Sequence, residues 1–167
     1  MVRGPHRNIE VSGPMIRNEQ QYRITKAQAQ RFADALQDAE ARPGADPRLQ
    51  KLEQEALSSQ MQELREQIEE YEALRSGQRS VLTLDSFDAF PGALVRARIA
   101  TGLSQRELAD RLGLKEQQVQ RYEATEYASA SLSRVKEVIA ALGIQVREDI
   151  FLPARNAAPD ANVAGSQ

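Results

Sequence analysis

The polar side chains between residues 115 and 121 are of the types that read DNA bases. The segment KEQQVQR contains three glutamines and one arginine. In the major groove, a glutamine can make paired hydrogen bonds to adenine, and an arginine can make them to guanine. The candidate base-reading residues are Glu116, Gln117, Gln118, Gln120 and Arg121, with Gln117 and Arg121 the principal ones. A solvated polar helix has a similar surface, so the interpretation depends on the elements that position these side chains.

Two short helices joined by a glycine turn are predicted around this segment. Ser104 and Glu107 have the spacing of a capping box, which fixes the start of the first helix. Gly113 ends that helix, and the second is predicted over residues 115–124. The apolar residues that would pack inward are Leu103, Leu108, Ala109, Leu112, Leu114, Val119 and Tyr122. This is a helix-turn-helix pattern, whose second helix enters the major groove.

The same stretch carries a longer motif. It matches L-[ST]-Q-x-E-L-A-x-x-L-G-[LV]-x-x-x-x-[VI]-x-x-[WY]-E through Leu103, Ser104, Gln105, Glu107, Leu108, Ala109, Leu112, Gly113, Leu114, Val119, Tyr122 and Glu123. On these residues, positions 94–144 resemble the Cro/C1-type (XRE-family) helix-turn-helix domain of bacterial and phage repressors. The resemblance implies a compact, mainly α domain that binds double-stranded DNA.

The resemblance also implies a role for individual residues. Positions 116, 117 and 121 would face the base edges, and Glu123 would brace the domain interior. The expected phosphate contacts are Ser104, Gln105, Arg106 and Lys115, and Gln105 would also help to orient the recognition helix. The structural core of the motif would comprise Leu108, Ala109, Leu112, Gly113, Val119, Tyr122 and Glu123.

Three positions depart from the family pattern. Lys115 replaces the usual Ser or Thr cap, and a lysine cannot accept a hydrogen bond from a backbone N–H. Glu116 would repel phosphates and would pair well only with cytosine. Ala124 and Thr125 replace the frequent Asn-Gly pair, so we expect a different backbone shape in the loop that follows.

The composition of the 167-residue chain bounds its function. The chain has no cysteine, and its one histidine, His6, lies in a Gly- and Pro-rich N-terminal stretch. Thiol nucleophiles, zinc sites and common nucleophile–base pairs therefore lack their residues, and we predict no enzyme activity, metal or cofactor. No apolar run reaches the length of a membrane span, which favours a cytoplasmic protein.

The charge of the chain is unevenly distributed. The net charge is −2, yet residues 96–121 hold six basic and three acidic side chains, whereas residues 27–79 hold seven basic and eleven acidic ones. Arg96 and Arg98 are expected to point outward from a helix that begins at Pro91. The sequence therefore predicts a localised basic footprint for DNA on an acidic molecule.

The fold class predicted is mainly α. Residues 1–14 are expected to be a disordered extension before a more natural start at Met15, and residues 153–167 a disordered tail. Residues 15–79 would form a helical hairpin, and residues 80–90 a connector in which Phe87 and Phe90 are buried. The helix-turn-helix domain would span 91–152. Its last helix, 131–142, would place Leu132 against the core, and short strands are predicted at 80–84 and 144–152.

The hairpin predicted at 15–79 comprises one helix over 25–41, capped by Thr25, and a longer one over 47–75, capped by Asp46. The longer helix carries a heptad seam formed by Leu57, Met61, Leu64, Ile68 and Tyr71. Three partners for the seam stay open: a second copy, which we expect first, the chain's own C-terminal domain, or another protein.

Three functions follow from the sequence. The first is a sequence-specific DNA-binding regulator, a repressor acting as a homodimer on a two-fold operator. The second is an antitoxin that resembles the HigA type and holds a toxin through its N-terminal helices. The third is a structural dimer with a helix-turn-helix that does not bind DNA.

Overall fold

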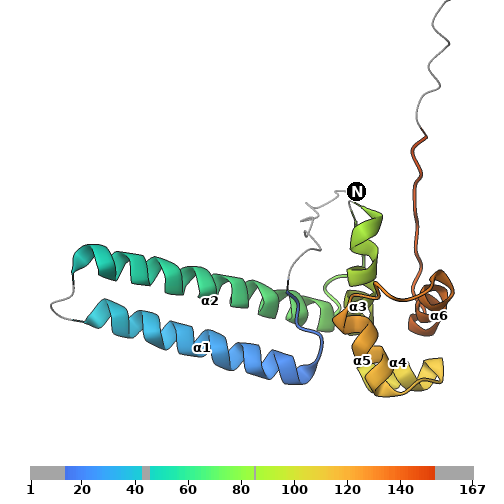
Figure 1. Cartoon of the computed structure of the whole chain (residues 1–167), viewed down its shortest axis with the longest axis horizontal. Helices are drawn as coiled ribbons and strands as arrows, with labels where there is room; N and C mark the ends of the chain where they lie inside the picture. The colour runs from blue at the N-terminus through green and yellow to red at the C-terminus, as the bar shows by residue number, and fades with distance from the viewer. Residues whose placement is uncertain (1–13, 43–45, 85, 153–167) are drawn as a thin grey trace, which may run out of the picture.

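The computed structural model describes residues 14–42, 46–84 and 86–152. Over these residues the chain is helical and contains no β-strand. A long antiparallel hairpin projects from a compact group of short helices (Figure 1). The elements are α1 (Glu19–Ala41), α2 (Pro47–Arg75), the 3-10 helix η1 (Phe87–Ala89), α3 (Phe90–Ala100), α4 (Gln105–Leu112), α5 (Glu116–Ala124) and α6 (Leu132–Leu142).

The hairpin predicted from the two N-terminal helices is confirmed, but its first helix begins earlier than expected. Asn18, not Thr25, is the N-cap, and its side chain accepts a hydrogen bond from the backbone N–H of Gln21 at 2.9 Å. The prediction was wrong because the Asn18 side chain caps the free N–H of Gln21 and starts the helix at Glu19, so that Thr25 lies inside the helix. Asp46 caps α2 as predicted, with Pro47 at the first helical position.

The heptad seam of α2 lies against α1 of the same chain. Leu57, Met61, Leu64 and Ile68 are half-buried, and only Tyr71, near the base, is buried. Tyr71 stacks on Tyr22 of α1 with ring centroids 5.0 Å apart. The stripe stays partly open because two helices alone cannot enclose it.

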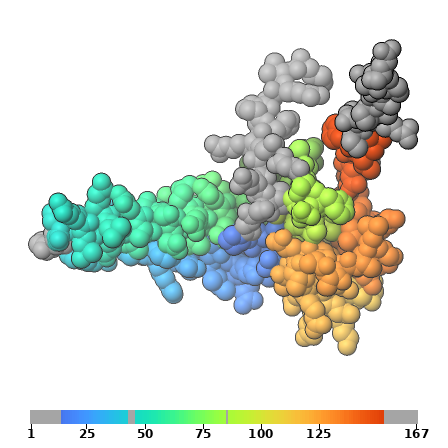
Figure 2. All heavy atoms as spheres, turned by 45° about the horizontal axis from the view of Figure 1, so that its top comes forward, coloured from blue at the N-terminus to red at the C-terminus, as the bar shows by residue number. Residues whose placement is uncertain are grey.

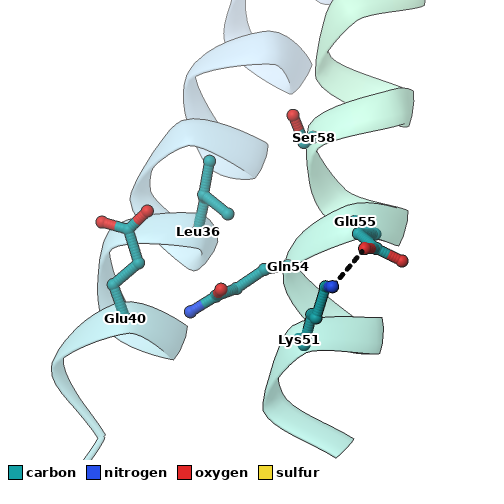
Figure 3. A pocket seen from close by; sticks show the side chains of 6 residues that line it. All are labelled: Leu36, Glu40, Lys51, Gln54, Glu55 and Ser58. Atoms are coloured by element: carbon teal, nitrogen blue, oxygen red, sulfur yellow. Dashed lines mark ion pairs between the residues drawn. The ribbon is translucent and has the colours of Figure 1, made fainter. Parts of the chain in front are cut away.

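A shallow hollow marks the same open packing in the outer half of the hairpin (Figure 3). It is lined by Leu36, Glu40, Lys51, Gln54, Glu55 and Ser58. Lys51 and Glu55 form an exposed ion pair of 3.8 Å across one helical turn. The lining is mostly polar, as expected where solvent reaches between two helices.

The C-terminal domain, α3 to α6, is organised around α3. Every residue from Gly92 to Ile99 is buried, because α2 and α6 both pack against this helix. Val95, Leu108 and Val138 meet in the same core and are almost completely inaccessible. A single buried helix therefore supports the two helices of the predicted motif.

The base of the hairpin belongs to the core of this domain. Met15, Ile16 and Leu74 are buried in one cluster with residues of α3 and α4. Arg96 of α3 donates to Glu70 of α2 at 2.7 Å, and this arginine is buried. The space-filling view shows the hairpin continuous with the domain (Figure 2). The hairpin is thus anchored by apolar contacts and by an ion pair.

Several predictions about the segments around the domain were wrong. Residues 80–84 and 144–152 form no strand, since within the described chain neither finds a partner for its backbone groups. Phe87 is exposed and stacks on the buried Phe90, and Leu132 at the first turn of α6 is exposed too. The expectations for residues 1–13 and 153–167 lie outside the described residues. Among the described helices, none combines the length and apolar character needed to cross a membrane.

Candidate nucleic-acid interface

The first helix of the motif, α4, begins with the predicted capping box. The Ser104 hydroxyl accepts a hydrogen bond from the backbone N–H of Glu107 at 3.1 Å, and the Glu107 carboxylate accepts one from the backbone N–H of Ser104 at 2.8 Å. The carboxylate accepts bonds from both the backbone N–H and the hydroxyl of Ser104, and these two bonds hold the pKa of Glu107 below its ordinary value of 4.5. Gly113 ends α4 in the left-handed conformation, with φ +65°. The start and end of the helix follow from local sequence.

The recognition helix, α5, starts at Glu116 with Lys115 in the N-cap position. The Lys115 side chain makes no cap bond, as its chemistry requires. Instead, the Gln118 side-chain oxygen accepts a hydrogen bond from the backbone N–H of Lys115 at 3.0 Å. Gln120 donates to Glu116 at 3.2 Å, one helical turn away. Gln118, Gln120 and Glu116 are therefore all engaged within the helix.

All five predicted base-reading residues are exposed on α5. Within the described part of the chain, the side chains of Gln117 and Arg121 make no hydrogen bond or ion pair. Val119 and Glu123 are buried, and Tyr122 is half-buried, which fixes the helix on the domain. The two principal candidates thus have unoccupied polar groups on a firmly held helix.

The predicted phosphate contacts fall into two groups. Arg106 and Lys115 are exposed, and Ser104 is exposed with its hydroxyl in the capping box. Gln105 is instead buried: its amide donates to Glu123 at 2.8 Å and accepts from Asn18 at 3.5 Å. The structure places this side chain in the domain interior because Glu123 and Asn18 take up its hydrogen-bonding groups.

Glu123 is the centre of a buried polar network. Its carboxylate accepts two hydrogen bonds from Arg98, at 2.5 and 2.9 Å, and one from Gln105. Arg98 also donates to the backbone oxygens of Leu103 and Arg17. The carboxylate and the guanidinium are both buried, and each is paired, as a buried charge must be. This network joins α3, α4, α5 and the segment before α1.

Sequence reasoning missed the contribution of Arg17 and Asn18, which lie next to this network. The pattern Asn18-x-x-Gln21 was the available signal, since it has capping-box spacing. Asn18 accepts from the backbone N–H of Gln21, as in a capping box, but the Gln21 side chain accepts from the backbone N–H of Arg17 at 2.9 Å rather than from that of Asn18.

The basic surface predicted for residues 96–121 carries less positive charge than the sequence of that segment suggests. Arg96 and Arg98, expected to point outward, are buried and paired with Glu70 and Glu123. The prediction was wrong because carboxylates remote in sequence take these arginines into the interior. The exposed charges left in the segment are the basic Arg106, Arg111, Lys115 and Arg121 and the acidic Glu107, Asp110 and Glu116. The surface excess is thus one positive charge rather than three.

The loop after α5 has an unusual backbone. Glu126 and Tyr127 have φ values of +47° and +57°, in the left-handed region that side chains other than glycine rarely adopt. Tyr127 is buried and stacks on Tyr122 with centroids 5.8 Å apart. Burial raises the pKa of its hydroxyl well above the ordinary value. Packing of the Tyr127 ring offsets the strain of the turn and fixes the end of the recognition helix.

Comparisons with known proteins agree with this geometry. Residues 94–148 match the family model described as Helix-turn-helix. No curated protein and no solved structure matches the chain. The capping box, the left-handed Gly113 and the buried Val119 and Glu123 lie within the matched region. Residues 94–148 therefore form a DNA-binding helix-turn-helix domain of the Cro/C1 type, the XRE family of transcriptional regulators.

Proposed function

We propose that this chain is a sequence-specific repressor that reads the major groove with α5 and binds a two-fold operator as a dimer. The observation that carries the proposal is the exposed face of α5, where Gln117 and Arg121 have no partner among the described residues. Unpaired glutamine and arginine side chains can make bidentate hydrogen bonds to adenine and guanine.

Backbone contacts would come from side chains flanking this face. Arg106 and Lys115 are exposed beside the motif and carry the charge that phosphates require. Because Gln105 is buried against Glu123, its role here would be to position α4 relative to α5 rather than to supply a side-chain contact to DNA. The exposed side chains of residues 96–121 carry an excess of only one positive charge. Base contacts must therefore supply much of the preference for the operator over other DNA.

The test is selection of DNA from a random library at low and near-physiological salt. The native chain should enrich a palindromic site, and Gln117→Ala should weaken binding to that site by about 1–3 kcal/mol and relax one position in each half-site. Gln37→Ala, an exposed glutamine of α1, is the matched control and should leave the selected site unchanged. Equal losses for Gln117→Ala on the selected site and on random DNA would contradict base reading.

A second candidate function is that of an antitoxin, favoured by the outer end of the hairpin. Leu49 and Leu52 are 66% and 63% exposed there, far from the recognition helix (Figure 1). Exposed leucines on a projecting element are typical of a protein-binding surface. A small toxin-like reading frame beside the gene, whose product copurifies with the native chain but not with Leu49→Lys/Leu52→Lys, would support this function. Absence of such a frame would reject it.

A further inference from the structure

The most exposed apolar residues of the described chain lie beyond α6, not on the hairpin seam. Ile150, Phe151 and Leu152 are 83%, 92% and 83% exposed, and Val146 is exposed as well. They belong to residues 144–152, IQVREDIFL, which leave α6 as an extended segment (Figure 1). Ile144 is half-buried against the domain core, and its N–H donates to the Ile139 oxygen at 3.4 Å. Residues 145–152 have neither a strand partner nor an apolar cover within the described chain, although the residues of the segment alternate as in a strand.

The sequence of this segment is complementary to itself in one antiparallel register. With Glu148 opposite Glu148 of a second copy, Ile144 lies opposite Leu152 and Val146 opposite Ile150. On the other face, Arg147 lies opposite Asp149, and this pair occurs twice because the register is symmetric. On the first face apolar residues therefore meet apolar ones, and on the other face opposite charges meet, the pairings that stabilise an antiparallel ribbon. The unfavourable pairs are Glu148 with itself and the apolar Phe151 with the polar Gln145.

We infer that residues 144–152 of two copies pair as antiparallel strands about a two-fold axis at Glu148, and that this pairing is the dimer contact. The inference rests on the proposed function only in that a two-fold operator calls for a two-fold protein. A ribbon of two strands is marginal alone. Both views show the segment passing the N-terminal end of α3, which the exposed Phe87 immediately precedes (Figures 1 and 2).

Cysteine cross-linking tests the register directly, because the full chain contains no cysteine of its own. Directly opposite residues in an antiparallel pair have Cα atoms about 4.5–5.5 Å apart, which suits a disulfide. Glu148→Cys should therefore form a covalent dimer under mild oxidation. Gln145→Cys, whose symmetry mate would lie several residues away along the ribbon, and Ser133→Cys, exposed on α6, are the matched controls and should stay monomeric on a denaturing gel.

Charge reversal tests the pairing without oxidation. By sedimentation equilibrium, Arg147→Glu should raise the dimer dissociation constant about tenfold or more, because both cross-strand pairs become repulsive. The double variant Arg147→Glu/Asp149→Arg should restore it to near the native value. Lys136→Glu, the same charge change on the exposed face of α6, should leave it unaltered. Glu148→Val should tighten the dimer by removing the like-charge pair.

The outcomes separate this inference from the proposed function. A native chain that stays monomeric throughout, a Glu148→Cys variant that cross-links no faster than Ser133→Cys, or a double variant that is not rescued would each overturn strand pairing. Binding to a single half-site is measured in parallel for the native chain and Arg147→Glu. Equal half-site binding with loss of the dimer supports the inference, whereas an intact native dimer that recognises no DNA site rejects the proposed function alone.

Discussion

In the helix-turn-helix domain, the side chains of Val95, Leu108 and Val138 are completely buried, whereas the leucines of the hairpin seam are only partly covered. Both regions are built from amphipathic helices. In the domain, α2, α6 and η1 all contact α3, but the outer hairpin has only two helices and leaves its stripe open to solvent. The difference shows that amphipathic periodicity alone does not determine burial, which depends on how many elements converge on a stripe.

The two regions also differ in how polar groups are used. Charged pairs of the outer hairpin, such as Arg42 with Glu53 at 3.1 Å, are exposed and contribute little to stability. In the domain, the Arg98–Glu123 pair is buried and satisfied by further hydrogen bonds. Because Arg98 also binds the backbone of Arg17, the base of the hairpin takes part in the domain's network. We therefore expect that unfolding of the domain also unfolds the hairpin, whereas fraying of the outer hairpin leaves the domain folded.

The largest effect is expected for Arg98→Met. Removing the guanidinium leaves the Glu123 carboxylate buried without a counter-charge, which should lower the free energy of unfolding by about 3–5 kcal/mol. Urea unfolding followed by circular dichroism measures this. Adding Glu123→Gln should recover part of the loss, because the uncompensated charge is then gone. A loss below about 1 kcal/mol for the single variant would show that the network does not hold the domain together.

A pair of leucine truncations compares the two cores directly. Leu108→Ala in α4 should cost about 2–5 kcal/mol, because that side chain is fully buried. Leu64→Ala in the half-buried seam should cost only about 1 kcal/mol. The same urea titration measures both variants. Equal losses of unfolding free energy in the two variants would contradict this comparison. They would indicate that a second copy covers the seam in solution.

The capping box gives a smaller effect with a defined pH dependence. Ser104→Ala should cost about 1 kcal/mol at neutral pH. Since folding lowers the pKa of Glu107 below 4.5, the ionised carboxylate stabilises the domain at neutral pH, and this contribution is lost as the pH falls through the lowered pKa. Glu107→Gln should therefore flatten the acid side of the stability profile. An unchanged profile in that variant would assign the acid sensitivity to other carboxylates.

The smallest effect is expected at the outer end of the hairpin. Leu52→Lys should change the free energy of unfolding by no more than about 0.5 kcal/mol, because this side chain is 63% exposed. Thermal and urea unfolding of the full chain measure the change. A larger loss in the isolated chain would indicate that the end of the hairpin is covered by another copy, which would weaken the contrast between the two regions.

The sequence by itself determined the features that depend on neighbours within one helical turn. The caps at Ser104 and Asp46, the stop at Gly113 and the inward position of Val119 all follow from such local patterns, and the structure confirms each. The exposed position of Gln117 and Arg121 follows in the same way, because periodicity around Val119 fixes the opposite face of α5.

Only the tertiary structure decided which charged and polar side chains are interior. Arg96 and Arg98 were expected to point outward from α3, yet both are buried, each paired with a carboxylate from another helix, Glu70 of α2 and Glu123 of α5. Gln105 is buried for the same reason. Strand formation at 144–152 likewise depends on a partner, and none exists among the described residues. Local patterns specify helices, whereas the burial of a charge and the pairing of a strand depend on groups remote in sequence.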